Sequence, residues 1–372
     1  MPVEESKELG KAAIFHGVGK PFSFANFPIP RDDEGLLVKI TMATICGSDI
    51  HRVRGFGKTA VPAIIGHEST GRVHSLPRDV QQDYAGNRIK VGDRIVYPYF
   101  KYCGRCHACL NREIMMVECE NRLGLSGGIS CEEPPHFNGA FAEYLYLRPG
   151  MAFFKVPDEL SDEVVTPLNC ALSAVYHGVV KLGGVRHGDS VVIQGAGALG
   201  VYAAALTKRM GASKVIVIDK IEERLKFIEQ FGADRTVNLE EFTSTDSLVE
   251  AIFGLTEGKG ADVAIEVSGS PKAFPDGVKM LRKGGRYLEM GSITQEARSQ
   301  VDIFLIALRE LHIVGNMNYD AWVIPKALEF LKQTQDTYPY GKIISHKYPL
   351  EQINEAFNVA MQGHCIRVAL IP

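Results

Sequence analysis

Half of the eight cysteines of this chain fall within the stretch "CGRCHACLNREIMMVEC". Cys103, Cys106 and Cys109 have C-x-x-C-x-x-C spacing, and Cys119 follows the third of them after nine residues. Four thiolates can surround a zinc ion tetrahedrally and leave no position open for a substrate. The stretch therefore predicts a structural zinc site that stabilises a loop and takes no part in catalysis.

A second set of residue types that bind zinc is spread over three shorter segments, "TICGSDIH", "GHES" and "PLNCA". A buried cysteine is most often a small hydrophobic residue, and an isolated histidine is most often a packed or surface group. These segments indicate a zinc site only when they are considered together with the nucleotide-binding motif further along the chain. Their candidate residues are Cys46, Ser48, Asp49, His51, His67, Glu68 and Cys170.

The stretch "VVIQGAGALGVYAAAL" carries Gly195, Gly197 and Gly200 at G-x-G-x-x-G spacing, between an apolar strand and a helix. The first glycine allows a tight turn, the second lets the backbone approach a pyrophosphate, and the third lets the helix pack on the strand. The N-terminus of that helix, which includes Leu199, presents free N–H groups to phosphates. This context predicts a dinucleotide site.

Asp219 ends the next apolar strand, "VIVID". A carboxylate at this position accepts the ribose hydroxyls of NAD and repels the 2′-phosphate of NADP. We therefore expect NAD(H) as the cofactor. The positive charges of Lys220 and Arg224 lie close in sequence, so the strictness of that preference stays open, and Arg224 is itself a candidate cofactor ligand.

The elements that position these residues change in character along the chain. The first third is rich in β-branched segments separated by Gly, Pro and Asp, which indicates a compact, mostly β domain. From about Ala171, short apolar strands alternate with helices, which indicates a parallel sheet covered on both faces. After about Gly315 the pattern is less regular and ends in "IRVALIP", a candidate strand returning to the first domain. The expected class is α/β, with a mostly-β domain over 1–171 and 315–372 and a doubly wound domain over 172–314.

Composition excludes several other classes of protein. The chain has 372 residues, 45% hydrophobic and 23% charged, with a formal net charge of −3. This balance gives no electrostatic reason to expect nucleic acid or an acidic membrane as a partner. The N-terminal residues lack the apolar core of a signal peptide, and no apolar run approaches the ~20 residues that span a bilayer. We expect a cytoplasmic protein, in which clustered thiols hold metal rather than form disulfides.

Taken together and in this order, these motifs resemble those of the zinc-dependent medium-chain alcohol dehydrogenase family. The resemblance extends over essentially the whole chain. It implies a GroES-like domain, a Rossmann domain and a C-terminal return to the first. It also implies that Cys46, His67 and Cys170 bind a catalytic zinc, with Glu68 behind the metal as an alternative ligand and Asp49 bonded to His67.

The same resemblance implies a chemistry. Zinc acts as a Lewis acid on an alcohol, Ser48 relays the alcohol proton through the NAD ribose to His51, and hydride passes between substrate and nicotinamide. Arg367 in "CIRVAL" matches a family arginine that approaches the cofactor pyrophosphate; an exposed or ion-paired arginine is the equal alternative. The expected reaction interconverts a primary or secondary alcohol and its aldehyde or ketone.

Several alternatives stay open. The substrate could be a polyol or an amino alcohol, and the protein could be a non-catalytic NAD-binding sensor. The family spacing between the third and fourth structural ligands ends at Val117, so we assign Cys119, which precedes "ENR", with Cys131 as the second candidate. A homodimer or homotetramer is expected, and "VDIFLIALRELHIVG" lies where family members pair.

Overall fold

The structure is a computed structural model that describes residues 8–30, 34–110, 119–294 and 297–372. The chain divides into two compact units. The first unit contains Met1–Cys170, Asp320–Asp336 and Tyr340–Pro372, and the second contains Ala171–Tyr319 and Thr337–Pro339. This division concerns compactness alone. The limits of the functional domains, expected above at 171/172 and 314/315, stay a prediction.

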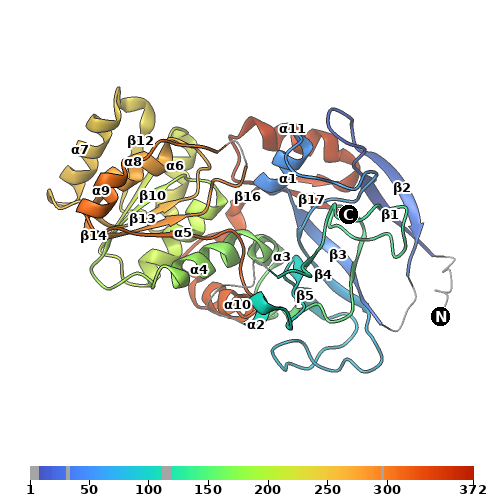
Figure 1. The fold of residues 1–372 in the computed structure, drawn as a ribbon. Coiled ribbons are helices and arrows are strands. Elements are labelled where there is room, and N and C mark those ends of the chain that lie inside the picture. Colours follow the sequence, from blue (N-terminus) through green and yellow to red (C-terminus); the bar gives the residue numbers. More distant parts are fainter. Residues whose placement is uncertain (1–7, 31–33, 111–118, 295–296) are drawn as a thin grey trace. The chain divides into compact units, whose positions relative to one another are not determined.

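The first unit is built mainly of strands (Figure 1). Its main sheet has the order β16-β17-β3-β4-β5-β9, with β8 also paired to β3, and two small sheets pair β1 with β2 and β6 with β7. The strands are β1 (Leu9–Ile14), β2 (Ser23–Pro28), β3 (Leu36–Thr44), β4 (Glu68–Ser75), β5 (Arg94–Val96), β6 (Phe100–Lys101), β7 (Leu123–Gly124), β8 (Tyr144–Leu147), β9 (Phe154–Lys155), β16 (Ile344–Pro349) and β17 (Arg367–Ile371). Its helices are α1 (Gly47–Val53), α2 (His107–Leu110), α3 (Asp162–Val165), α10 (Val323–Thr334) and α11 (Ile353–Gln362), with 3-10 turns at η2 (Thr166–Asn169), η5 (Tyr340–Ile343) and η6 (Leu350–Gln352).

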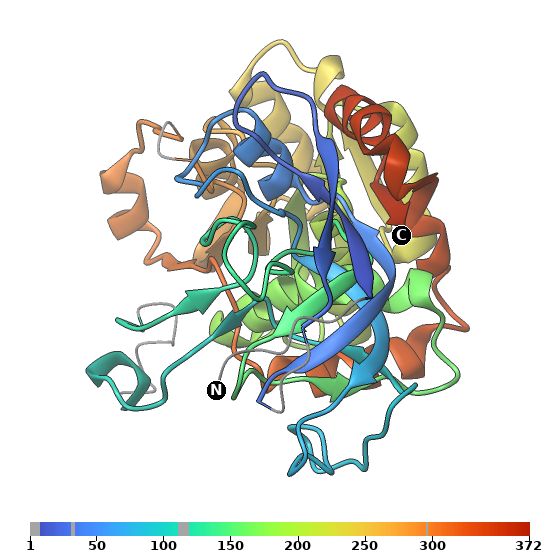
Figure 2. The ribbon, with the colours of Figure 1, turned by 90° about the vertical axis from the view of Figure 1, so that its right-hand side faces the viewer.

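Strand β3 is the centre of this unit because both of its faces are covered. Val38 and Ile40 belong to one hydrophobic cluster, and Leu37, which points the other way, belongs to another. The expected C-terminal strand is confirmed: β17 pairs antiparallel with β3 and parallel with β16. Figure 2 shows the strands from the two ends of the sequence, coloured blue and red, within this unit. The segment after Gly315 is more regular than its sequence suggested, since it contains helices α10 and α11.

The second unit is a parallel sheet in the order β12-β11-β10-β13-β14-β15. Its strands are β10 (Ser190–Gln194), β11 (Lys214–Asp219), β12 (Arg235–Asn238), β13 (Ala261–Glu266), β14 (Leu281–Glu289) and β15 (His312–Gly315). Its helices are α4 (Ala171–Lys181), α5 (Ala198–Arg209), α6 (Glu222–Ile228), α7 (Thr245–Leu255), α8 (Ala273–Met280) and α9 (Ile303–Leu308), with 3-10 turns at η3 (Glu229–Phe231) and η4 (Leu239–Glu241).

Helices cover both faces of this sheet (Figure 1). Val192 of β10 packs in one cluster with residues of α7 and α8. Its neighbours Val191 and Ile193 are also fully buried, and they point to the opposite face, because side chains alternate along a strand. The strands are therefore continuous apolar runs, as the sequence indicated. Polar residues stand where strands end, with Asp219 closing β11 and Glu266 closing β13.

None of the helices in the described ranges combines the length and the apolar character needed to cross a membrane.

Candidate functional site

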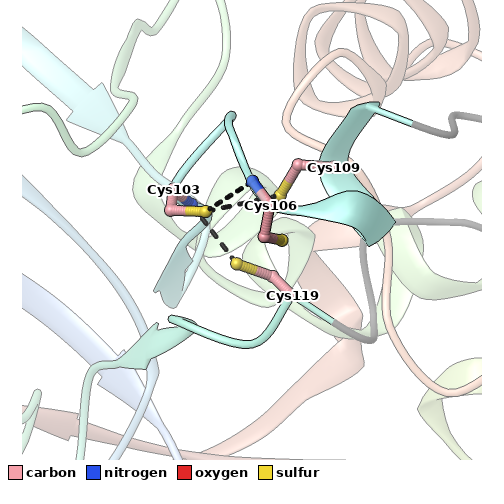
Figure 3. Close-up of side chains that lie close together, drawn as sticks. All are labelled: Cys103, Cys106, Cys109 and Cys119. Atoms are coloured by element: carbon pink, nitrogen blue, oxygen red, sulfur yellow. Dashed lines mark hydrogen bonds between the residues drawn. The ribbon is translucent and has the colours of Figure 1, made fainter.

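The four clustered cysteines converge in space (Figure 3). Their sulfur atoms all lie within 4.8 Å of one another. Backbone N–H groups point at the sulfurs: Cys106 donates to Sγ of Cys103 at 3.4 Å, and Cys103 donates to Sγ of Cys119 at 3.3 Å. Four sulfurs at this spacing, with N–H donors that stabilise thiolates, fit the donor set of a closed zinc site.

The electrostatics of the cluster also suit a dication. The backbone N–H of Arg105, with further donors from Asn121 and Cys106, lowers the pKa of Cys103 to about 6. Burial and the neighbouring sulfurs raise the pKa of Cys109 to about 12. One thiol therefore ionises readily while another resists, because adjacent thiolates repel each other. A bound cation removes that repulsion, so the residues present fit zinc.

The structure distinguishes the two candidates for the fourth ligand. Cys119 lies with the other three cysteines. Cys131 is buried in a separate hydrophobic cluster that contains Ile14 and Phe137. Val117, where the family spacing ends, lies outside the described residues.

A second group of possible metal ligands forms around the end of β3. Cys46, His67, Glu68 and Cys170 each offer one atom, and these atoms lie within 4.8 Å of one another. The two sulfurs are 3.9 Å apart. The residues come from distant parts of the sequence: the N-cap of α1, the start of β4 and the end of the 3-10 turn η2.

Asp49 holds two members of this group in place. Its carboxylate is 1% exposed; Oδ2 accepts the backbone N–H of Cys46 at 3.0 Å, and Oδ1 lies 3.1 Å from Nδ1 of His67. The second contact fixes the imidazole ring and leaves Nε2 directed toward the site. Oγ of Ser48 lies 3.3 Å from that Nε2, so a hydroxyl stands beside the candidate metal position.

Glu68 is fully buried and occupied on both oxygens. Oγ1 of Thr44 donates to Oε2 at 2.6 Å, and Arg367 donates to Oε1 at 2.8 Å. Burial raises the pKa of Glu68 to about 8, although the positive charge of Arg367 opposes the shift. Arg367 forms an ion pair with Glu68, and its buried guanidinium lies 3.6 Å from Sγ of Cys46; its contact with a cofactor stays a prediction. Both carboxylate oxygens of Glu68 therefore already have partners within the protein.

The members of this group ionise unequally because they lie so close together. A hydrogen bond from Cys170 lowers the pKa of Cys46 well below its usual value. The same hydrogen bond, together with burial, raises the pKa of Cys170. Burial alone would lower the pKa of His67, but the Asp49 carboxylate and Cys46 outweigh it and raise that pKa. Two sulfurs and one imidazole with a hydroxyl alongside fit a catalytic zinc, which keeps one position for water or substrate.

His51 lies on α1 three residues after Ser48 and packs edge-on against Phe56, with ring centroids 5.4 Å apart. Burial and the charge of Arg54 lower its pKa, so its imidazole is neutral near pH 7 and can accept a proton. Tyr99 packs edge-on against His67 at 5.0 Å.

The second unit holds a cavity of about 610 Å³ at the carboxyl ends of its strands. Among the residues predicted to bind cofactor, it is lined by Gly195, Gly197, Asp219 and Arg224. Gly195 has a backbone φ of +116°, a conformation that would be strained for any residue with a side chain. Gly200 lies in the first turn of α5 with Leu199, and a Cβ there would collide with the carbonyl oxygen of Gly195. The glycine turn therefore lets helix α5 pack closely against the end of strand β10, as predicted.

Asp219 has a contact that the sequence did not suggest. Its Oδ2 accepts the N–H of Ala196 inside the glycine turn at 2.7 Å, and its Oδ1 accepts the N–H groups of Lys220 and Ile221 at 2.7 and 3.0 Å. The carboxylate thus ties the end of β11 to the turn after β10. A carboxylate offers about four lone-pair sites, so Oδ2 keeps capacity for a ribose hydroxyl.

Sequence reasoning missed the roles of Thr44, Tyr99 and Glu266. Thr44 carries no motif, because its contact with Glu68 arises from the pairing of β3 with β4. Tyr99 packs against His67 from a loop far away in the sequence and carries no motif either. Glu266 did leave a signal, because it is the acidic residue that ends the strand-like run "ADVAIE". A charge at that place marks the carboxyl edge of a parallel sheet, where ligands bind.

Comparisons with known proteins agree with this architecture. The family model described as "Alcohol dehydrogenase GroES-like domain" matches residues 32–158, and the model described as "Zinc-binding dehydrogenase" matches 198–333. The chain is 30% identical over 336 residues to 5-exo-hydroxycamphor dehydrogenase of Pseudomonas putida, covering 90% of each chain. It is 30% identical over 373 residues to sorbitol dehydrogenase of Bacillus subtilis, covering 97% of each.

Solved structures show the same similarity. An alcohol dehydrogenase from Thermotoga maritima superposes with a TM-score of 0.92 at 30% identity, over 98% of this chain and 100% of that one. A zinc-binding dehydrogenase from Sinorhizobium meliloti, bound to NADP, has a TM-score of 0.85 at 26% identity, over 98% and 100% of the two chains. Two metal-ligand clusters, a glycine-turn cavity and relatives along the whole length lead to one conclusion: the chain is an oxidoreductase of the zinc-dependent medium-chain alcohol dehydrogenase family.

Proposed function

We propose that this protein is an NAD(H)-dependent dehydrogenase that interconverts a secondary or primary alcohol and its carbonyl compound, with one catalytic and one structural zinc. The observation that supports it best is the grouping of Cys46, His67 and Cys170 around the hydroxyl of Ser48. When bound, zinc supplies a Lewis acid for the substrate oxygen and the nicotinamide supplies the hydride acceptor or donor. The cysteine cluster at Cys103 holds the structural ion.

The chain's own residues have distinct proposed roles. Asp49 orients His67 so that Nε2 serves as a ligand, and Glu68 with Arg367 forms the buried ion pair behind the ligand set. Ser48 holds the substrate's hydroxyl proton at Oγ. His51, neutral because of its burial, is the outer acceptor of that proton.

At the dinucleotide cavity we propose that Gly195, Gly197, Leu199 and Gly200 bring backbone N–H groups to the pyrophosphate, with Arg224 beside Gly197. Asp219 accepts a ribose hydroxyl through the capacity left on Oδ2, and its charge disfavours a 2′-phosphate. This supports NAD over NADP even though a similar protein was solved with NADP. Arg367 is proposed to contact the cofactor pyrophosphate in addition to Glu68.

For the substrate, the relatives point to secondary alcohols, since their names include hydroxycamphor and sorbitol. We also propose that the protein is a homodimer or homotetramer. Helix α9 supports this: Ile303, Phe304 and Leu308 are 78%, 69% and 57% exposed, and the helix precedes the edge strand β15. Exposed apolar side chains gathered on one short helix are typical of a surface that another chain covers.

Ser48→Ala should lower kcat for NAD-linked alcohol oxidation by about 10²–10⁴-fold, because it removes the hydroxyl that holds the substrate proton. The assay follows NADH absorbance with a bicyclic secondary alcohol, a polyol and a primary alcohol. Ser48→Thr, which keeps a hydroxyl, is the matched control and should retain most of the activity. An alanine variant within about twofold of wild type, or a wild type inactive on every alcohol, would argue against the proposal.

Asp219→Asn should reduce the preference for NAD over NADP, expressed as the ratio of kcat/KM values, by about tenfold or more. The change keeps the shape of the side chain and removes the charge that opposes the 2′-phosphate, and about 1.4 kcal/mol of lost repulsion corresponds to tenfold. Glu222→Gln, which removes a nearby exposed carboxylate of α6, should leave the ratio nearly unchanged. Equal ratios in wild type and Asp219→Asn would show that Asp219 does not select the cofactor.

Cys119→Ser should lower the zinc content by one ion per chain and destabilise the cysteine loop, since the metal contributes to folding. Cys131→Ser, a change at a buried cysteine of a separate cluster, should leave the zinc content unchanged. Elemental analysis of the gently purified variants measures both. The reverse pattern, with zinc lost only from Cys131→Ser, would identify Cys131 as the ligand.

A further inference from the structure

Two glutamates lie side by side at the carboxyl edge of the parallel sheet. Glu266 ends β13 and Glu289 ends β14, and the two residues are direct partners in the parallel register. Glu266 is 0% exposed, and Glu289 is partly buried. Like charges this close in a buried place are unfavourable, so the pair needs an explanation that the zinc chemistry does not give.

The carboxylate of Glu266 accepts hydrogen bonds on both of its oxygens. Its Oε1 accepts the backbone N–H and the hydroxyl of Ser268, at 2.7 and 2.6 Å, and the N–H of Gly269 at 2.8 Å. Its Oε2 accepts the N–H of Gly291 at 2.9 Å. Four donors stabilise a carboxylate without any cation.

The surroundings of Glu289 favour its protonated form. Its Oε1 accepts the backbone N–H of Ser292 at 3.2 Å. Its Oε2 is buried and finds no hydrogen-bond donor. Burial, and then the negative charge of Glu266, raise the pKa of Glu289 to about 7. A protonated Glu289 that donates to Glu266 satisfies both groups.

The groups around Glu289 come from several elements. Glu266 faces it from β13, and Tyr287 on β14 is close enough for both glutamates and Asp276 of α8 to raise its pKa, after burial. On the side of β15, the N–H of Asn316 donates to the backbone carbonyl of Glu289, and the Asn316 side chain bonds Nδ1 of His177 on α4 at 2.9 Å.

Glu266 contacts the wall of the dinucleotide cavity. Val267, Ser268, Gly269 and Ser270 line that cavity, and Glu266 is the group that ties their backbone to Gly291. Glu266, Gly269 and Gly291 are tightly packed, because a Cβ on Gly291 would collide with Oε2 of Glu266 and with the backbone nitrogen of Gly269. A negative charge on Glu289 would repel the carboxylate of Glu266 and so disturb the hydrogen bonds from Ser268 and Gly269 that fix the cavity wall.

We propose that Glu289 shares one proton with Glu266 and acts as a positioning residue, so that loss of this proton loosens the wall Val267–Ser270 and weakens dinucleotide binding. The inference rests on the proposed function, which makes NAD(H) the occupant of the cavity. A group whose folded-state pKa is raised keeps its proton below that pKa and loses it above. Affinity should therefore be full in mildly acidic solution and fall as the pH rises through about 7.

The test is calorimetric titration of the full-length protein with NAD⁺ between about pH 6 and pH 8.5. The wild-type Kd should rise by up to about thirtyfold across this range, because the protonated fraction of a group with a pKa of about 7 falls by that factor between pH 6 and pH 8.5. Glu289→Gln should keep the low-pH affinity throughout, because an amide is a neutral donor at every pH. Glu222→Gln, which removes an exposed carboxylate elsewhere in the same unit, should retain the wild-type slope.

A flat wild-type profile, or a Glu289→Gln variant with the wild-type slope, would overturn the proposal. If the Glu289→Gln variant fails to fold, infrared spectroscopy of the wild-type protein tests for the shared proton instead. The carbonyl stretch of a buried carboxylic acid should be present at about pH 6 and vanish as the pH rises, and its absence at pH 6 would refute the shared proton. Failure of NAD⁺ to bind at any pH would instead contradict the proposed function, and the infrared band would still test the pair.

Discussion

The hydrogen bonds of one buried carboxylate, that of Asp49, underlie the geometry of the candidate zinc site. Asp49 accepts the backbone N–H of Cys46 on one oxygen and contacts Nδ1 of His67 with the other. A thiolate from the end of β3 and an imidazole from the start of β4 are thereby set side by side. The carboxylate itself is fixed because it lies in the first turn of α1, where the helix N-terminus favours a negative charge.

The return of the C-terminal strand completes this arrangement. Because β17 pairs with β3, Arg367 is placed beside Glu68 and near Sγ of Cys46, which lie 299 and 321 residues earlier in the sequence. A buried carboxylate without a partner would be costly, and removing one member of a buried pair is strongly destabilising. The ligand set of the first unit is thus supported by charges from both ends of the chain.

Sequence reasoning succeeded where chemistry is encoded locally. The glycine turn, the cysteine run and the alternation of apolar strands with helices depend on neighbours in sequence, and each formed as expected. It fell short where a contact depends on register between distant strands. The ion pair of Arg367 follows from the pairing of β17 with β3, the contact of Thr44 follows from the pairing of β3 with β4, and the proximity of Glu266 and Glu289 follows from the pairing of β13 with β14. The helices after Gly315 were missed because Pro325 and scattered polar residues obscure their periodicity.

The most direct test of the account is zinc per chain on gently purified protein, measured before and after a mild chelator together with NAD-linked alcohol oxidation. The two ligand clusters predict two zinc ions per chain. The ion at the open site of Cys46, His67 and Cys170 should leave first and take the activity with it, while the ion enclosed by four thiolates should remain. A single, tightly held zinc in active protein would contradict the assignment of the catalytic site.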